Sequence, residues 1–82
     1  MAKSFHLTVA KVGENLFEGE VISATLPGSE GMFQILAEHE AFVSQLKPGE
    51  VRIVDAAGGT YHFHIPQGGI AEVSSHQATV LL

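Results

Sequence analysis

The chain has 82 residues, of which 45% are hydrophobic and 16% charged, and its formal net charge is −5 at pH 7. So short a chain buries only about 60% of its unfolded surface and cannot supply two cores, so we expect residues 1–82 to form one domain. The basic residues are scattered along the chain, at Lys3, Lys11, Lys47 and Arg52. This pattern excludes the clustered positive charge that nucleic-acid binding requires.

Cysteines and long apolar segments are both missing from the sequence. Without cysteine there is no disulfide framework, no thiolate zinc site and no cysteine nucleophile. No apolar run approaches the ~20 residues that span a bilayer, and the start "MAKSFHLTV" alternates instead of forming a signal peptide. We expect the chain to stay in the compartment where it is made. Its apolar fraction is high for this size, which favours an exposed partner surface.

Alternation of apolar and polar residues predicts β-strands from the first residues onward. In "FHLTVAKV", Phe5, Leu7 and Val9 share one face and the polar residues share the other, as in a half-buried strand. The segments "LFEGEVISATL", with a bend predicted at Gly19, and "MFQIL" follow the same pattern. The turn "PGSEG" between them carries the proline and glycines that a tight turn needs.

The second half of the chain reads as two further hairpins. "KPGEVRIVDAAGGTYHFHI" contains a turn at Pro48 and Gly49, a strand, a hairpin turn at Gly58 and Gly59, and another strand. "GGIAEVSSHQATVLL" adds a hairpin with a polar turn at residues 74–76. The nearest helical pattern, "AEHEAFVSQL", stops within about two turns. Roughly eight or more short strands at this spacing predict an all-β, antiparallel sandwich or barrel.

Two histidines in "YHFHI" could hold a metal ion. His62 and His64 are two positions apart on a strand, so both imidazoles lie on one face, as in the metal sites of cupin-like barrels. Glu72 and His76 could then complete the ligand set. A solvent-facing histidine pair explains the sequence equally well, so a small metal-binding β-barrel using His62 and His64 stays open as the alternative function.

The run "AEHE" resembles an acid–base cluster. Glu38, His39 and Glu40 are consecutive, however, so their side chains diverge, and no pocket or positioned partner is apparent. We interpret the run as a solvated corner between two strands. No nucleophile elbow or phosphate-binding loop is present either. We therefore predict no catalytic residue, no cofactor and no small-molecule substrate. A carbohydrate- or peptide-binding sandwich is a weaker third hypothesis, because the chain has only 7% aromatic residues and no tryptophan.

The segments "LFEGEVISATLPGSEGMFQIL", "LKPGEVRI" and "GGIAEVSSHQATVLL", in this order and spacing, resemble the N-terminal domain of the epsilon subunit of F-type ATP synthases. The likeness covers nearly the whole chain. It implies a flattened antiparallel β-sandwich of about ten short strands. It also implies a non-catalytic central-stalk (rotor) subunit that links the gamma subunit to the membrane c-ring and supports the coupling of proton transport to ATP synthesis. Such a subunit is peripheral to the membrane through the complex, on the cytoplasmic face of the bacterial inner membrane.

The resemblance also implies a partner interface at the end of the sandwich that faces the c-ring and the foot of gamma. The matching positions are Ser29, Glu30, Gly31 and Met32 in the turn, and His39 and Glu40 at the corner. Two departures from the family stand out. Met32 occupies a position where an acidic residue is frequent, and the residues flanking His39 are acidic where the family has proline-containing pairs.

In full-length members of that family a two-helix hairpin follows this domain. The hairpin can inhibit ATP hydrolysis and, in some members, bind ATP. The sequence stops at Leu82, where the hairpin would begin, so we expect this chain to lack both activities.

Overall fold

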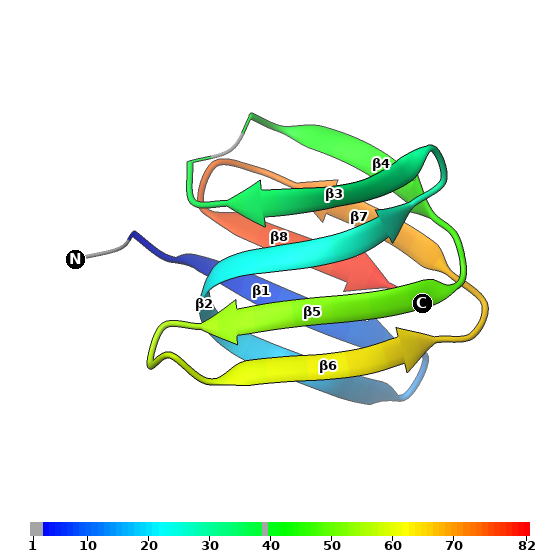
Figure 1. Cartoon of the computed structure of the whole chain (residues 1–82), viewed down its shortest axis with the longest axis horizontal. Coiled ribbons are helices and arrows are strands. Elements are labelled where there is room, and N and C mark those ends of the chain that lie inside the picture. Colours follow the sequence, from blue (N-terminus) through cyan, green and yellow to red (C-terminus); the bar gives the residue numbers. More distant parts are fainter. Residues whose placement is uncertain (1–2, 39) are drawn as a thin grey trace.

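The computed structural model describes residues 3–38 and 40–82, and this part of the chain is all-β (Figure 1). Its eight strands are β1 (Phe5–Lys11), β2 (Glu14–Gly28), β3 (Gly31–Leu36), β4 (Phe42–Leu46), β5 (Gly49–Asp55), β6 (Thr60–Ile65), β7 (Gly69–Val73) and β8 (Gln77–Leu81). The all-β prediction is confirmed. The described strands number eight rather than about ten, and the bend predicted at Gly19 is absent because β2 runs through it as one strand of 15 residues.

The long strand β2 belongs to both layers of the sandwich. Its first half pairs with β1, from Phe5↔Val21 to Lys11↔Glu14. Its second half pairs with β3 along one edge and with β5 along the other, after a register shift between Val21 and Ser23. The first layer therefore comprises β4, β7, β8, β1 and the first half of β2. The second layer comprises β3, the second half of β2, β5 and β6, and it lies in front in Figure 1.

One strand pair departs from the antiparallel prediction. Strands β1 and β8 are parallel, with His6 opposite Gln77 and Ala10 opposite Leu81, whereas the other pairings of the described strands are antiparallel. Alternation assigns residues to faces but carries no information on strand direction. A parallel pair needs a long connection, and here that connection is most of the chain.

The core fills the space between the two layers with the inward positions of nearly every strand. The buried apolar residues are Phe5, Leu7, Val9, Val21, Ala24, Leu26, Ile35, Leu46, Val51, Ile53, Ile65, Ala71, Val73, Ala78 and Val80. Two aromatic pairs close the sides in edge-to-face geometry: Phe17 with Tyr61 at 5.2 Å and Phe33 with Phe42 at 5.6 Å between ring centroids. Since these side chains alternate along their strands, outward residues such as His62 are left to solvent.

The β2–β3 hairpin is fixed by two glycines and by contacts with β4. A Cβ at Gly28 would lie 2.7 Å from the Gly31 carbonyl oxygen and 2.8 Å from the Phe33 ring, and Gly31 has a φ of +137°. Both positions therefore require glycine. The Ser29 amide donates to the Gln45 carbonyl at 2.9 Å, which ties the hairpin tip to the first layer.

Candidate partner-binding surfaces

The predicted turn residues lie together at the tip of the β2–β3 hairpin. Ser29, Glu30, Gly31 and Met32 are all exposed, and 56% of Met32 is accessible to solvent. The close packing at Gly28 and the hydrogen bond of Ser29 to β4 hold the backbone of this loop. The tip is thus a rigid projection that carries one carboxylate and one thioether, which suits contact with the polar loops of another protein.

The predicted corner lies at the other end of β3. Glu38 adopts a left-handed conformation with φ of 63°, which is uncommon for a residue other than glycine. Its amide donates to the Ser75 carbonyl at 3.1 Å, and its carboxylate pairs with the Lys3 ammonium group. The hydrogen bond and charge of that ammonium lower the pKa of the Glu38 carboxyl. Glu40 is exposed beside the corner, and His39 lies outside the described residues.

The structure does not bring the two predicted sets together. The first set ends at Met32, the second residue of β3, and Glu40 follows the strand, so the extended stretch from Met32 to Leu36, rising about 3.3 Å per residue, separates them by roughly 13 Å along β3. In Figure 1 the hairpin tip lies at the right-hand end of β3 and the arrowhead of β3 at the left. The predicted interface residues therefore form two separate surfaces rather than one patch.

The proposed metal-ligand set is not assembled. His62 and His64 do lie on the outer face of β6, where the nearest carboxylate is that of Glu50, with 3.9 Å between Oε1 and His62 Nδ1. Glu72 and His76 belong to β7 and the β7–β8 turn in the first layer, so they cannot complete this site. In residues 3–38 and 40–82, no group of three or more His, Cys, Asp or Glu side chains could hold a metal ion.

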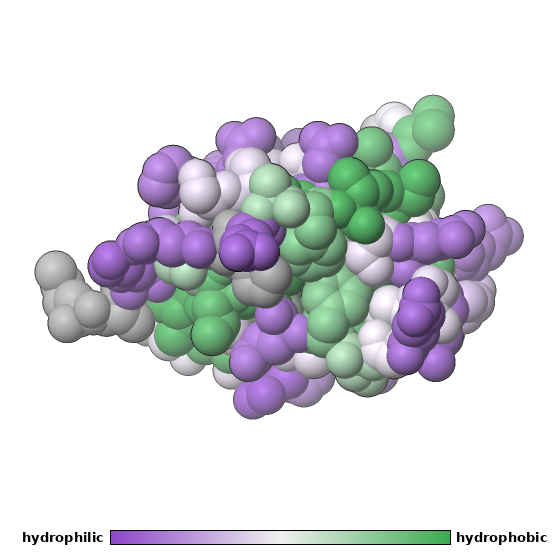
Figure 2. All heavy atoms as spheres, turned by 90° about the horizontal axis from the view of Figure 1, so that it is seen from above, coloured by the Kyte–Doolittle hydropathy of each residue, from purple (hydrophilic) through white to green (hydrophobic). Residues whose placement is uncertain are grey.

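Sequence reasoning missed an exposed apolar patch on the outer face of the first layer. Val43, Ile70 and Leu81 are 67%, 50% and 57% exposed. Ile70 on β7 lies opposite Leu81 on β8 and opposite Gln45 on β4. Gln45 is the next outward-facing residue after Val43 along β4. Exposed apolar surface also runs between polar side chains on the side of β3 and β4 (Figure 2). Alternation identifies these residues as outward, but only the strand order shows that they are neighbours.

Beside this patch, the same face carries a group of carboxylates around one histidine. His6 places Nε2 3.1 Å from Glu18 Oε2 and Nδ1 3.4 Å from Glu20 Oε2, and the Ser4 hydroxyl donates to Glu20 at 2.9 Å. Glu72 points outward from the neighbouring β7 strand, paired with Thr79. Because Glu18 and Glu20 are two residues apart on a strand, the sequence alone predicts that they share a face. Their contact with His6 depends on the β1–β2 register, which the sequence pattern does not give.

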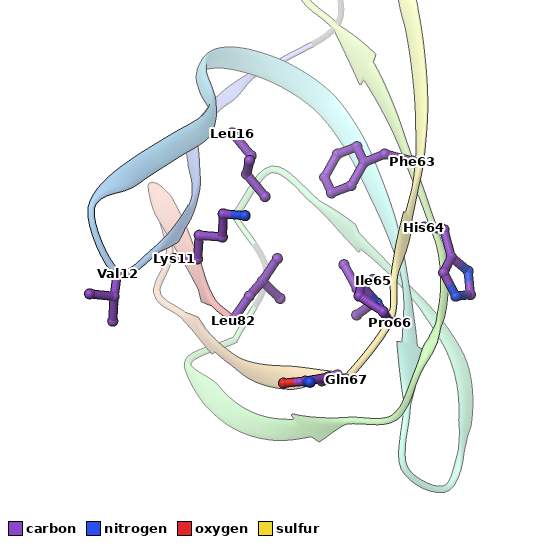
Figure 3. Close-up of a pocket in the computed structure, with 10 residues that line it drawn as sticks. Lys11, Val12, Leu16, Phe63, His64, Ile65, Pro66, Gln67 and Leu82 are labelled. Carbon is purple, nitrogen blue, oxygen red and sulfur yellow. The ribbon is translucent and has the colours of Figure 1, made fainter.

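A groove of about 810 Å³ opens between β6 and the β1–β2 turn. Figure 3 shows Leu16, Phe63 and Leu82 pointing into it, with the Lys11 ammonium group directed inward and His64 turned away. Its lining is largely apolar. No polar or charged side chain among the described residues is buried, so none of the described candidate acid–base groups has the enclosure that tunes a catalytic pKa. The part of the chain that the structure describes contains no helix long and apolar enough to cross a membrane.

A stiff sandwich with an exposed tip and an apolar face is the architecture of a small protein-interaction module. Residues 4–82 match the family described as the ATP synthase, Delta/Epsilon chain, beta-sandwich domain, and the chain belongs to this family.

Relatives in this family are epsilon chains of bacterial ATP synthases. The chain is 36% identical over 81 residues to the ATP synthase epsilon chain of Thioalkalivibrio sulfidiphilus, covering 99% of this chain and 57% of the relative. It is 40% identical over 78 residues to that of a Bradyrhizobium species, covering 95% of this chain and 56% of the relative. The chain thus spans little more than half the length of these relatives.

A solved structure is similar to this fold as well. The match is to a chain in the cryo-EM structure of the Euglena gracilis mitochondrial ATP synthase, in a map of OSCP, F1 and the c-ring, with a TM-score of 0.87 and 28% identity. It covers 95% of this chain and 49% of that one. A chain from the Tetrahymena thermophila mitochondrial ATP synthase, with a TM-score of 0.75 and 14% identity, shares the fold.

Proposed function

We propose that this chain is a non-catalytic central-stalk (rotor) subunit of an F-type ATP synthase. In this role it links gamma to the c-ring and supports the coupling of proton transport to ATP synthesis. The observation that carries the proposal is the family match across residues 4–82, on a chain whose relatives are ATP synthase epsilon chains. The bacterial relatives also support a peripheral position on the cytoplasmic face of the inner membrane, reached through the complex.

The two predicted interface sets fit two contacts of such a subunit. The tip formed by Ser29, Glu30, Gly31 and Met32 contacts the c-ring, because it is exposed, polar and held rigidly at one end of the sandwich. The corner with His39 and Glu40 contacts gamma from the other end of β3. The extended stretch of β3 between Met32 and Glu40 supports two distinct contacts over a single shared one.

Binding to gamma tests the proposal directly. The chain is mixed with the gamma subunit from the same organism, and the complex is analysed by size-exclusion chromatography with light scattering. We expect a complex of about 1:1 stoichiometry, and no ATP hydrolysis by the chain alone. A chain that remains monomeric beside a folded, soluble gamma subunit contradicts the proposed function.

A further inference from the structure

Strand β6 has one unpaired edge. It stands last in the strand order and, among the described strands, pairs only with β5. Within residues 3–38 and 40–82, no backbone hydrogen bond reaches β6 from its other side. The free N–H and C=O groups of such an edge pair readily with another extended chain, so many sheet proteins cover or charge their edges. On β6 the side chains from Thr60 to His62 are exposed, and nothing covers them.

The β5–β6 register shows which backbone groups of β6 are free. Hydrogen-bonded and non-hydrogen-bonded pairs alternate along an antiparallel ladder. The Asp55 amide donates to the Gly59 carbonyl at 2.9 Å, which makes this a hydrogen-bonded pair. The register continues from there without a shift, so every second residue after Gly59 bonds to β5. The residues between them, Thr60, His62 and His64, direct their amide and carbonyl groups toward the free edge.

The groove of about 810 Å³ adjoins the C-terminal half of this edge. His64 lines the groove, yet Figure 3 shows its imidazole turned away. The backbone of His64 is therefore the part that borders the groove. Leu16 and Leu82 project into the groove from the other side, toward Phe63 (Figure 3). The groove thus has a hydrogen-bonding edge along one wall and apolar side chains along the other.

A lysine also faces this groove. Figure 3 shows the Lys11 ammonium group directed inward. Its partner is the Glu14 carboxylate, with 3.4 Å between Nζ and Oε1, and both side chains are more than half exposed. So exposed an ion pair is weak, and a carboxylate held in the groove can replace it. No aspartate or glutamate is among the described residues that line the groove. The charge inside the groove is therefore positive.

We propose that this groove binds an extended peptide, which adds a strand to the free edge of β6. The backbone of the peptide pairs with His62 and His64. Its apolar side chains, at alternate positions, lie against Leu16 and Phe63, and a carboxylate near one end reaches Lys11. Main-chain pairing gives affinity in such a complex, and the side-chain positions give specificity. This peptide site goes beyond the proposed function and does not depend on it.

Two other occupants fit the groove less well. A second copy of the chain can bring its own β6 to this edge, but its Ile65 is buried in its own core and its Phe63 packs against that core. It therefore has no apolar side chains free to fill the groove. A fatty acid can fill the groove and meet Lys11, but its hydrocarbon chain has no hydrogen-bonding groups for the edge of β6. An extended peptide satisfies both walls.

Peptide binding and amide hydrogen exchange, both followed by NMR, test the site. Three acetylated hexapeptides alternate threonine with valine, leucine or phenylalanine and end in a free carboxylate. We expect at least one to bind and to slow exchange of the His62 and His64 amides. Failure of all three to bind overturns the site. Binding that leaves both amides unprotected overturns the strand addition.

N-methylated versions of the bound peptide supply a matched control. One version is methylated at the threonines and the other at the apolar residues, so only one of them loses the donors that face β6. We expect that version to bind about tenfold or more weakly, because backbone hydrogen bonds are lost, and the other to bind nearly as well as the parent peptide. Equal binding by the two versions overturns strand addition.

A pair of leucine variants tests the apolar wall. Leu16 and Leu36 are both exposed, by 40% and 51%, and of the two only Leu16 lines the groove. We expect Leu16→Ala to weaken peptide binding by about threefold or more and Leu36→Ala to leave it unchanged. The reverse ranking overturns the groove as the site.

The role of Lys11 is tested with the same peptide ending in a carboxylate or in an amide. We expect Lys11→Gln to weaken binding of the carboxylate form by about two- to fivefold and to leave binding of the amide form unchanged. An equal effect on both forms overturns the proposed charge contact.

Light scattering and laurate distinguish the other occupants. We expect the chain without peptide to remain monomeric, and laurate to bind more weakly than the peptide. A dimer that protects the His62 and His64 amides identifies a second copy as the occupant and overturns the proposal. Laurate binding in the groove where all three peptides fail also overturns it. None of these measurements involves gamma, so failure here leaves the proposed function intact.

Discussion

The chain reverses direction at both ends of β3, but different interactions stabilise the two turns. At the hairpin tip, Gly28 lies where a Cβ would clash with its neighbours, and Gly31 has a positive φ. Because both residues are glycine, the turn forms without a clash or backbone strain. At the corner Glu38 is held in a left-handed conformation by a hydrogen bond from its amide to Ser75 and by the ion pair with Lys3. The tip is therefore shaped by glycines within the turn itself and held by a hydrogen bond to β4, whereas the corner conformation depends on contacts with distant parts of the chain.

The largest effect is expected at the tip. In Gly28→Ala the new Cβ meets the Gly31 carbonyl and the Phe33 ring at less than 3 Å. Backbone must shift to relieve this contact, so we expect the free energy of unfolding to fall by about 2–3 kcal/mol. The matched control is Gly19→Ala, whose Cβ has ordinary contacts at 3.9 Å and no positive φ. Thermal unfolding should leave the control within about 0.5 kcal/mol of the unmodified chain.

A smaller effect is expected at the corner, from backbone strain alone. Glu38→Gly and Glu38→Ala both remove the carboxylate, but only glycine accepts the left-handed conformation freely. We expect the glycine variant to be more stable than the alanine variant by about 1 kcal/mol, which corresponds to a difference in Tm of about 4–8 °C for a domain of this size. Equal Tm values in the two variants contradict the idea that the corner is strained.

The ion pair at the corner contributes less, and its contribution depends on pH. The pKa of Glu38 is lowered in the folded chain by Lys3, so its stabilising effect is present above the unfolded pKa and is lost as pH falls through the folded pKa. We expect Lys3→Ala to lower Tm slightly near neutral pH. The difference from the unmodified chain should vanish in acid and shrink at high salt. A difference that persists in acid contradicts this account.

The smallest effect on folding, and the clearest on function, is expected from charge reversal at the exposed tip. Glu30→Lys should leave the free energy of unfolding within about 0.5 kcal/mol, because the side chain is exposed. In inverted vesicles carrying the reconstituted synthase, we expect it to reduce ATP-driven proton pumping without releasing the chain from gamma. Glu40→Lys, at the corner, should instead weaken gamma binding. Identical outcomes for the two variants contradict the assignment of separate partners.

Alternation predicted much of this fold, because it reports directly which residues face the core. Phe5, Leu7 and Val9 are buried as expected, and glycine-containing turns fall at the predicted positions. Alternation could not predict that β1 and β8 pair in parallel, or that β2 belongs to both layers. Both depend on which strands become neighbours, and that choice is made by packing of the whole chain.

The candidate surfaces were predictable only in part, for the same reason. The exposed tip follows from local turn chemistry, so Glu30 and Met32 could be placed from the sequence. Their separation from Glu40 follows from the extended strand between them. The patch of Val43, Ile70 and Leu81 gathers residues from three strands, so no local pattern identifies it.

Strand β2 has a mechanical consequence for the proposed role in a rotating stalk. It begins at Glu14 on the first layer, where it pairs with β1, and ends at Gly28, the base of the tip. A pulling force applied at the tip is therefore transmitted along the covalent backbone of β2 into the first layer. It does not have to cross the hydrogen bonds between strands to reach that layer.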